Sequence, residues 1–513
     1  MKRASSDMAS SDLDRRTLLG LLAASLSPLP TRSFAQVEAS LLDTARAMAA
    51  APYVPPTGVL PAPFAGLDYN AYRGIRPVAG RAAGLPQGGG FVVDLLPPGL
   101  YFPDPVTVER RVDGTLQDLP LTPDLFTFEP RYFDDIPATS PGAGFSGMRL
   151  RFPLNTPDVL DEVAVFQGAS YFRAIGQAMA YGLSARAVAL GTGGAAPEEF
   201  PRFTHLRLNE GMNGAITMEA LIDSPSLSGH LSMQITPGAD TAMDISVTLF
   251  PRVTLDSIGI APLTSMFLKG PMHGAASDDF RPRVHDSNVL HIHNGAGEHL
   301  WRPIANPTHI ETSAFADTGP RNFGLYQTTR RYEDFEDTEA RYEHRPSATV
   351  EPSGDWGAGA VMLVEIPTST EFLDNIVAFW RPARPLDVGG EYRFDYRLTW
   401  TLQEPSHDLP APILQSRSGR EHEFPTTRRF VIDFDTAPDG LSADIMAMGG
   451  PENAIAGASL FALPDGRGTR VTFVLTPAEA TALELRLVLR DVDGIAVSPV
   501  WLHRWTRKRD GGV

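Results

Sequence analysis

Short strands dominate this sequence from about Phe91 to its end, and they restrict the folds that it can adopt. Apolar and polar residues alternate over short runs, and Pro, Gly or Asp separates one run from the next. Examples are "FVVDLLPPGLYF" (91–102), "GMRLRFPL" (147–154) and "TAMDISVTLFPRV" (241–253). The 46 glycines and 45 prolines supply the turns that many short strands require. Strands and helices do not alternate and no glycine-rich phosphate loop is present, so the pattern predicts an all-β protein rather than a doubly wound nucleotide-binding fold.

The N-terminus has the features of an export signal. Paired arginines, Arg15 and Arg16, precede a short apolar run from Leu18 to Leu26, and a small residue, Ala35, marks the predicted cleavage point. The arginine pair favours the twin-arginine route. An uncleaved anchor is disfavoured because the apolar run is too short to span a bilayer. We therefore predict a signal peptide over residues 1–35, followed by one short helix that ends before the proline pair Pro55-Pro56.

The charge and the cysteine content of the sequence restrict the partners and the chemistry that we expect. The formal charge of −17 becomes −19 without residues 1–36, which carry five basic and three acidic side chains. Such a surface repels nucleic acid and anionic membranes, so neither is an expected partner. The sequence has no cysteine, which excludes disulfides, thiolate catalysis and a lipobox anchor. We predict a protein free in the periplasm, with an oligomeric state that the sequence does not give.

A change of pattern suggests two domains. The segment "RPARPLDVGGEYR" (381–393) reads as a linker, and the remainder is rich in alternating strands. These strands are "YRFDYRLTWTL" (392–402), "RRFVIDFD" (428–435), "RVTFVLTP" (470–477) and "LELRLVL" (483–489). Together they span roughly 120 residues, the size of an immunoglobulin-like sandwich. We predict a large β-sandwich over 36–383 and a small immunoglobulin-like β-sandwich over 384–513.

Two places in the large domain carry candidate chemistry. "AVMLVEIP" (360–367) and "IVAFWRP" (376–382) predict a hairpin, with Asp374 where the loop meets the second strand. An ionised carboxylate beside such a run is costly unless it is partnered, and desolvation raises its pKa. The alternative is an ordinary turn or capping aspartate that accepts from nearby backbone N–H groups.

The second place is the polar segment 278–307, which contains Asp286 and several histidines. His291 and His293, two apart on a strand, would share a face and could ligate a metal. No third ligand is evident near them, so we predict no metal and no cofactor. The Asp-Ser-Asn run after His285 could also be a simple turn.

The chain resembles the OpgG/OpgD (MdoG/MdoD) family of periplasmic glucan biosynthesis proteins, and is more similar to the OpgD branch in its twin-arginine signal. Motifs that carry the resemblance run through most of the large domain. They are "GASYFRAIGQ" (168–177), "YGLSARAVAL" (181–190), "EEFPRF" (198–203), "APLTSMFL" (261–268), "RPRVHDSN" (281–288), "EHLWRPIANP" (298–307), "RYEHRPSA" (341–348), "GDWGAGAVMLVEIPT" (354–368) and "DNIVAFWRP" (374–382). The C-terminal domain matches only in its strand pattern.

The resemblance implies a large galactose-mutarotase-like β-sandwich with a cleft, joined to an immunoglobulin-like domain. It also implies action on the β-1,2-linked glucose backbone of osmoregulated periplasmic glucans, by an anomer-inverting glucanase or transglycosylase. By this resemblance Asp374 of the "DNIV" motif is the general acid and Asp286 of the "HDS" motif is the general base.

Two tryptophans, Trp301 and Trp356, are candidate sugar platforms, because a flat ring can pack on the apolar face of a glucose unit. The alternative is that both are core aromatics of a sandwich. The acidic run "YEDFEDTEARYEHR" (332–345) is expected to be a solvated loop, with Arg341 and Arg345 as its counter-charges, or to rim the cleft. The rival function is a non-catalytic glucan-binding or scaffold protein that assists an inner-membrane glucan synthase.

Overall fold

A computed structural model describes residues 40–56, 60–81, 83–84, 90–138, 140, 143–209, 211, 213–272, 278–404, 409–422 and 426–510. The predicted export signal and its cleavage point lie outside these residues. The predicted short helix is present as α2 (Leu41–Ala50), which ends before Pro55. Its apolar face, with Leu41 and Ala45, packs on Leu221 and Phe250. The other α-helices among the described residues are the short α3 (Tyr69–Arg73) and α4 (Arg507–Asp510).

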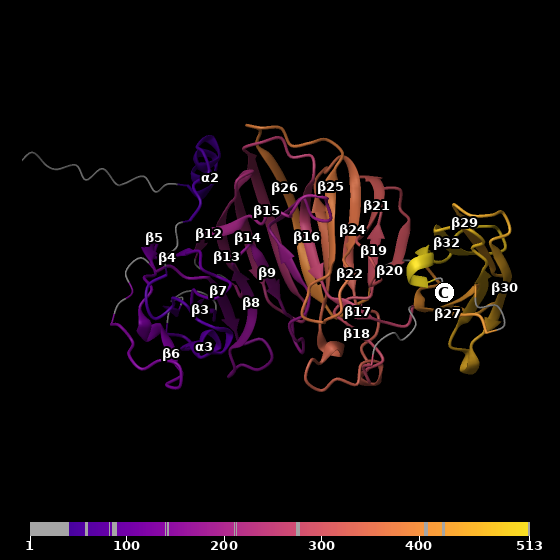
Figure 1. Ribbon diagram of the computed structural model, residues 1–513, viewed down its shortest axis with the longest axis horizontal. Coiled ribbons are helices and arrows are strands. Elements are labelled where there is room, and N and C mark those ends of the chain that lie inside the picture. Colours follow the sequence, from indigo (N-terminus) through magenta and orange to yellow (C-terminus); the bar gives the residue numbers. More distant parts are fainter. Residues whose placement is uncertain are drawn as a thin grey trace, which may run out of the picture. The chain divides into compact units, whose positions relative to one another are not determined.

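Two large sheets make up most of the described chain, which confirms the all-β prediction (Figure 1). The first sheet has the spatial order β2 (Ala83–Gly84), β3 (Val92–Leu96), β7 (Gly147–Phe152), β8 (Asp161–Gln167), β9 (Tyr171–Ala174), β10 (Ser184–Arg186), β16 (Ile258–Ser265), β25 (Ile376–Pro382), β24 (Ala358–Glu365) and β21 (Glu311–Thr318), with β11 (Val188–Leu190) also paired to β16. The second sheet has the order β29 (Ser442–Met448), β32 (Ala482–Arg490), β33 (Val500–Thr506), β20 (His299–Pro303), β19 (Val289–His293), β22 (Asn322–Tyr326), β23 (Ser347–Ser353), β26 (Tyr392–Thr401), β15 (Thr241–Pro251), β14 (Leu227–Thr236), β13 (Ile216–Asp223), β12 (Arg202–Leu208), β4 (Thr107–Val112) and β5 (Thr115–Asp118).

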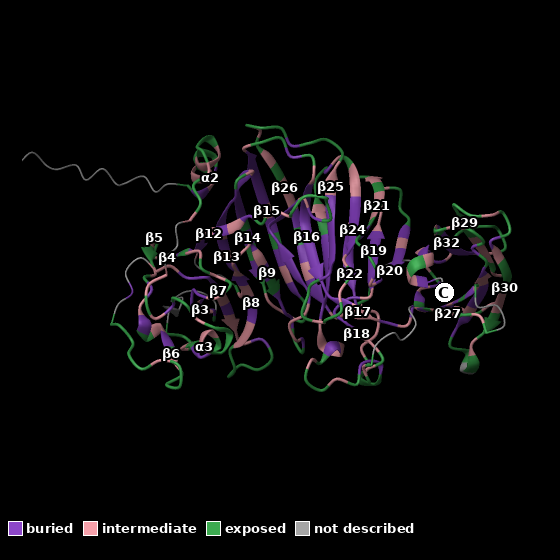
Figure 2. Cartoon of the chain, in the orientation of Figure 1, coloured by how far each residue is buried: buried purple, intermediate pink, exposed green. Residues whose placement is uncertain are grey.

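The main core lies between these sheets. Every residue of the central strand β16 is buried, whereas the edge strand β21 alternates between buried or half-buried residues and exposed ones (Figure 2). Alternate side chains of a strand point to opposite faces, so the inward residues of both sheets meet in one apolar cluster. The predicted hairpin is confirmed: β24 and β25 pair antiparallel from Gly359↔Pro382 to Glu365↔Ile376.

Smaller sheets complete the fold. The C-terminal region has a sheet of β27 (Ile413–Arg420), β28 (Arg428–Phe434), β31 (Thr469–Leu475) and β30 (Ile455–Ala462). It packs against β32 and β33, where Leu483, Leu485 and Leu487 meet Phe430 and Phe473. Two short pairs, β1 (Ile75–Pro77) with β6 (Phe126–Phe128) and β17 (Phe267–Lys269) with β18 (Val284–His285), lie outside these sheets.

The predicted domain boundary after residue 383 does not match the strand pairing. The first strand assigned to the small sandwich, β26, pairs with β15 and β23 in the large sheet. The expected linker carries the chain from β25 in one large sheet to β26 in the other, and Leu386 bridges to Leu255 on the way. The alternating pattern identified the strand correctly, but alternation does not show which neighbours a strand will pair with.

The two sandwiches also share a sheet. Strand β20 pairs in parallel with β33, with Leu300 opposite Val500 and Trp301 opposite Trp501. The small sandwich therefore takes one of its two layers, β29-β32-β33, from the end of the large sheet.

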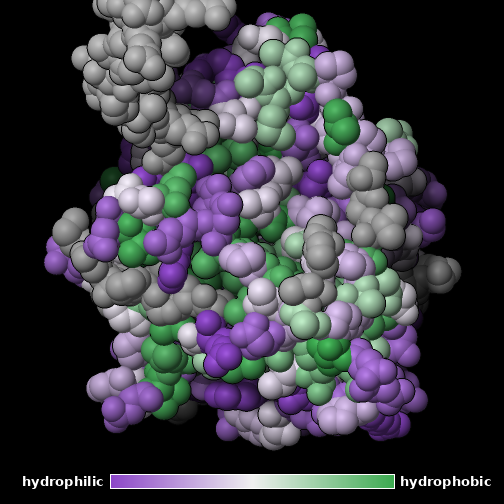
Figure 3. Space-filling view, turned by 90° about the vertical axis from the view of Figure 1, so that its left-hand side faces the viewer, coloured by the Kyte–Doolittle hydropathy of each residue, from purple (hydrophilic) through white to green (hydrophobic). Residues whose placement is uncertain are grey.

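No helix among the described residues is long and apolar enough to cross a membrane. On the face shown in Figure 3, hydrophobic and hydrophilic residues are interspersed. Single exposed apolar residues of this kind are ordinary on soluble surfaces.

Candidate active site

The two predicted catalytic aspartates are held by consecutive residues of one segment, between β16 and β17. The backbone N–H of Asp286 donates to the carbonyl of Met266 (2.8 Å). Asn375, the neighbour of Asp374, accepts from the backbone N–H of Phe267 (2.8 Å) and donates to its carbonyl (3.0 Å). Since these anchors are adjacent in sequence, the "HDS" and "DNIV" motifs meet although they are far apart along the chain.

Asp286 is buried and carries a direct counter-ion. Its side chain is 4% exposed, and Arg345 Nη1 lies 2.5 Å from Asp286 Oδ1. The Arg345 guanidinium sits 4.2 Å from the centre of the Tyr342 ring, which fixes its plane. Burial raises the pKa of Asp286, the ion pair with Arg345 opposes that rise, and the charge of Asp374 adds to it. The two carboxyls are therefore close enough to influence each other's ionisation.

The residues next to Asp286 have other partners. His285 Nδ1 lies 3.1 Å from Gln327 Oε1, the Ser287 hydroxyl meets Ser265 (2.9 Å), and Asn288 bonds to Thr328 (2.9 Å). Burial lowers the pKa of His285 to about 3, so its ring is neutral near pH 7. The cation beside Asp286 is therefore Arg345, from a distant part of the sequence, and not one of its neighbours.

Asp374 lies in the loop between β24 and β25, two residues before β25 begins. Its side chain is exposed, and the accessible surface opens into a cavity walled by protein. Surrounding protein atoms displace part of its hydration, which raises the pKa of Asp374, and the more distant charges of Arg173 and Arg186 oppose the rise. Within the described part of the chain, no ion pair like that of Asp286 is formed by Asp374.

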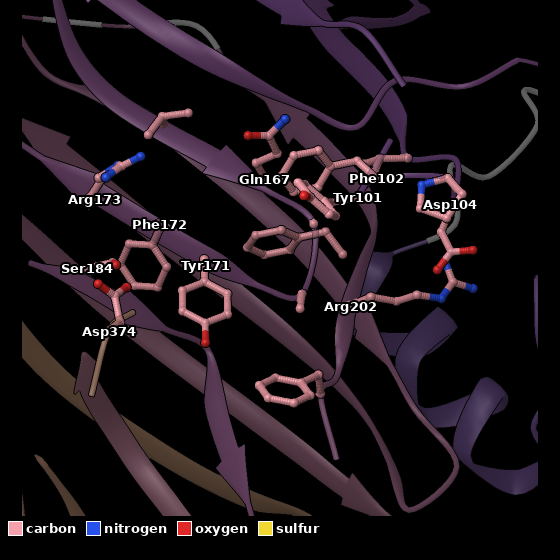
Figure 4. A pocket seen from close by; sticks show the side chains of 17 residues that line it. Tyr101, Phe102, Asp104, Gln167, Tyr171, Phe172, Arg173, Ser184, Arg202 and Asp374 are labelled. Atoms are coloured by element: carbon pink, nitrogen blue, oxygen red, sulfur yellow. The ribbon is translucent and has the colours of Figure 1, made fainter. Parts of the chain in front are cut away.

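The cavity beside Asp374 has a volume of about 480 Å³, within the usual range for small-molecule sites. In Figure 4, Asp374 and Ser184 lie at one end, and Asp104 and Arg202 lie at the other. Aromatic rings line the space between and around them: Tyr101, Phe102, Tyr171, Phe172, Phe200 and Phe203. Tyr101 is 77% exposed and Phe200 46% exposed, so both rings are open to a ligand.

A glycine shapes one wall of this cavity. Gly168, at the turn between β8 and β9, has a φ of +66°, in the left-handed region that favours glycine. A Cβ at this position would come within 2.9 Å of the Phe102 ring. A side chain there would therefore strain the turn and displace Phe102.

The two predicted tryptophan platforms are not in this cavity. Trp356 is 7% exposed and packs against Trp380, Phe394 and Tyr396, so its faces are covered by the core. Trp301 is 5% exposed and belongs to the core shared with the small sandwich, although it borders a separate pocket of about 170 Å³. The core alternative describes Trp356 better, because a sugar needs an accessible ring face.

The candidate histidines lie together on β19 and β20. His291 Nε2 lies 3.3 Å from His299 Nδ1, and the rings of His293 and His299 stack with centres 4.0 Å apart. Within the described ranges, no group of three or more His, Asp or Glu side chains is arranged to hold a metal ion.

Sequence reasoning missed Arg345 as the counter-ion of Asp286 and missed the aromatic lining of the cavity. Signals for both were present, because Arg345 belongs to "RYEHRPSA", and the lining residues Tyr171, Phe172 and Phe200 belong to "GASYFRAIGQ" and "EEFPRF". The site thus combines one buried, ion-paired carboxyl, Asp286, with one carboxyl that faces the cavity, Asp374.

Comparisons with known proteins show the family of the chain. The family model described as "Periplasmic glucan biosynthesis protein, MdoG" matches residues 37–505. Glucans biosynthesis protein G of Vibrio cholerae serotype O1 is 42% identical over 475 residues, covering 90% of this chain and 85% of that protein. Glucans biosynthesis protein G 1 of Shewanella oneidensis is 41% identical over 479 residues, covering 91% of this chain and 86% of that protein. The chain belongs to the MdoG family of periplasmic glucan biosynthesis proteins.

Proposed function

We propose that this protein is an anomer-inverting glucanase or transglycosylase that acts on the β-1,2-linked backbone of periplasmic glucan. Membership of a glucan biosynthesis family supports glucan as the substrate class. The observation that carries the catalytic part is the meeting of the Asp286 and Asp374 motifs at the Met266–Phe267 segment, with Asp374 at one end of an aromatic-lined cavity.

The difference between the two carboxyls supports their roles. A general acid must be protonated when substrate binds, and a general base must be ionised. Burial raises the pKa of both carboxyls, but only more distant cations oppose the rise at Asp374, so we assign Asp374 as the proton donor. Asp286 has Arg345 at 2.5 Å, which favours its charged form. In inverting enzymes the second carboxylate activates an acceptor on the face of the sugar opposite the leaving group.

The cavity lining supports a carbohydrate ligand. Tyr101, Tyr171 and Phe200 offer ring faces on which glucose units can stack. For the hydroxyl groups, Arg202 offers hydrogen-bond donors and the Gln167 amide oxygen offers an acceptor, since the Gln167 amide nitrogen already donates to Ser146. In this proposal a chain of glucose units lies along the cavity, with its scissile oxygen at Asp374.

The test is to incubate purified protein with linear β-1,2-glucan and follow the anomeric protons by NMR in the first minutes. Hydrolysis with inversion gives an α-configured reducing end, and transfer with inversion gives an α-linkage. A β-configured first product would indicate a retaining mechanism and would remove the proposed roles. Glucan binding without any product would favour the scaffold function that assists a membrane synthase.

Export by the twin-arginine route is also part of the proposal. Family membership implies the periplasm, and the arginine pair Arg15 and Arg16 supports this particular route. Replacing both by lysine should retain the precursor inside the cell, whereas the unchanged protein should be recovered from the periplasm with Gln36 as its first residue. Unimpaired export of the double variant would contradict the proposed route.

A further inference from the structure

One guanidinium near the candidate active site contacts three carboxylates. Arg281 binds Asp279 through Nε (3.0 Å) and Nη2 (2.9 Å). Its Nη1 donates to Asp337 Oδ2 (2.8 Å) and to Glu371 Oε2 (2.7 Å). The four side chains are between 12% and 25% exposed, so water screens these contacts only partly.

The three carboxylates come from three segments, and each segment carries part of the candidate site. Asp279 and Arg281 belong to the segment that leads to Asp286. Asp337 belongs to the turn that ends at Arg345, the counter-ion of Asp286. Glu371 belongs to the loop of Asp374. Arg281 therefore joins every segment that supplies the proposed acid, the proposed base or its counter-ion.

The loop of Asp374 has few other restraints at its middle. Its first part is fixed at Thr368. The Thr368 backbone N–H donates to the side-chain oxygen of Asn306 (3.0 Å), and the Thr368 carbonyl accepts from the side-chain nitrogen of Asn306 (2.8 Å). Its last part is fixed by Asn375. Between them, Phe372 is 91% exposed and Leu373 is 46% exposed, so neither packs the loop onto the core. Glu371 supplies the contacts in the middle of the loop, to Arg281 and to the Tyr342 hydroxyl (2.7 Å).

The charges make these contacts depend on Arg281. Its single positive charge faces three negative charges, and Lys269, 3.8 Å from Asp279, is the nearest further cation paired with this group. The contact with Arg281 lowers the pKa of Asp279 to about 2, so this carboxyl stays ionised at neutral pH. Without Arg281, like charges on the three segments would repel one another and move the segments apart.

We propose that Arg281 is a positioning residue that holds the loop of Asp374 in place against the segments of Asp286 and Arg345. The expected effect on the rate rests on the proposed function, whereas the expected effect on the loops rests on the ion pairs alone. A displacement of about 1 Å at reacting groups can cost about 100-fold in rate.

The first arm of the test compares Arg281→Met with Arg331→Met, which removes a neighbouring arginine that is 73% exposed and paired with Asp334. On β-1,2-glucan, kcat should fall about 10–100-fold in Arg281→Met and stay unchanged in Arg331→Met. The loss should be smaller on a β-1,2-linked donor with a nitrophenyl leaving group, which needs less help from the acid. A merely destabilised protein would lose the same fraction on both substrates. Arg281→Lys should recover part of the rate, since lysine restores the charge but not the planar fork.

The second arm measures amide hydrogen exchange in the same variants without substrate. Residues 366–375 and 332–345 should exchange faster in Arg281→Met than in Arg331→Met, and adding Asp337→Asn to Arg281→Met should slow that exchange by removing one repelling charge. Unchanged exchange in Arg281→Met, or equal rate losses on both donors, would overturn the proposal. If the protein without any substitution is inactive on glucan, the proposed function is wrong. The exchange data would still decide whether Arg281 holds the loops.

Discussion

The surroundings of Asp286 and Asp374 differ in almost every respect. Asp286 is buried, follows a short strand and pairs directly with Arg345. Asp374 is exposed to a cavity, lies on a loop between two anchors, and has only distant cations. Burial raises the pKa of both carboxyls, and the comparison shows how their surroundings still differ: a direct ion pair opposes the rise at Asp286, whereas only more distant charges oppose it at Asp374.

Removing each carboxyl should separate the two roles and give the largest effects. Asp374→Asn and Asp286→Asn should each lower the rate on β-1,2-glucan about 10²–10⁴-fold, because each removes one partner of acid–base catalysis. With the nitrophenyl donor, Asp374→Asn should recover much of its rate and Asp286→Asn should not. Initial rates on both donors check this, and recovery by Asp286→Asn instead would exchange the two roles.

Replacing Arg345 by methionine should remove the ion pair that distinguishes Asp286 from Asp374. Asp286 would stay buried without its partner, so its pKa should rise further and the acidic limb of the kcat/KM profile should move to higher pH. A buried unpaired carboxylate costs about 3–5 kcal/mol, so unfolding should require less denaturant at neutral pH.

The pH dependence of that loss follows from the sign of the shift. Because the folded-state pKa lies above the unfolded value, stability is lost as pH rises from the unfolded value through the folded one, and the loss is absent at lower pH. Denaturant unfolding at several pH values measures it. A loss of stability in Arg345→Met that does not vary with pH would show that Asp286 is not the cause.

Aromatic residues extend the comparison from the carboxyls to their surroundings. Tyr101→Ala removes a ring that is 77% exposed at the cavity, so KM should rise about tenfold, the equivalent of about 1.4 kcal/mol, with little change in stability. Trp356→Ala removes a core ring and should cost about 3–5 kcal/mol of stability without a selective change in KM. Kinetics and thermal unfolding of both variants check this, and the opposite pattern would restore Trp356 as the sugar platform.

Exhaustive chelation should have the smallest effect, which is none. The proposed chemistry uses two carboxyls and an arginine, so activity after EDTA treatment and dialysis should equal that of the untreated protein. Loss of activity that a divalent ion restores would indicate a metal role for the histidines around His291.

Much of the fold could be predicted from the sequence, because strand alternation is a local pattern. The roles of Asp286 and Asp374 stay predictions that rest on the family motifs. The hairpin that carries Asp374 in its loop was predicted from two apolar runs, and these two strands do pair with each other. The place of β26 was not, because strand pairing depends on residues far away in sequence. Arg345 was assigned to a solvated loop because it has acidic neighbours in sequence, whereas its carboxylate partner, Asp286, lies 59 residues away. Trp356 was a candidate sugar platform because the sequence does not distinguish a covered ring from an accessible one.

The parallel pairing of β20 with β33 has a consequence for how the chain folds. Leu300 finds its partner Val500 only after some 200 further residues have been synthesised. Until then the large sheet ends at β20 with an open row of backbone donors and acceptors, which is a surface prone to pair with other chains. Contacts of such long sequence separation also slow folding, since the closure entropy of the intervening chain must be overcome first. We therefore expect the nascent protein to be most vulnerable to aggregation just before its last strand is made.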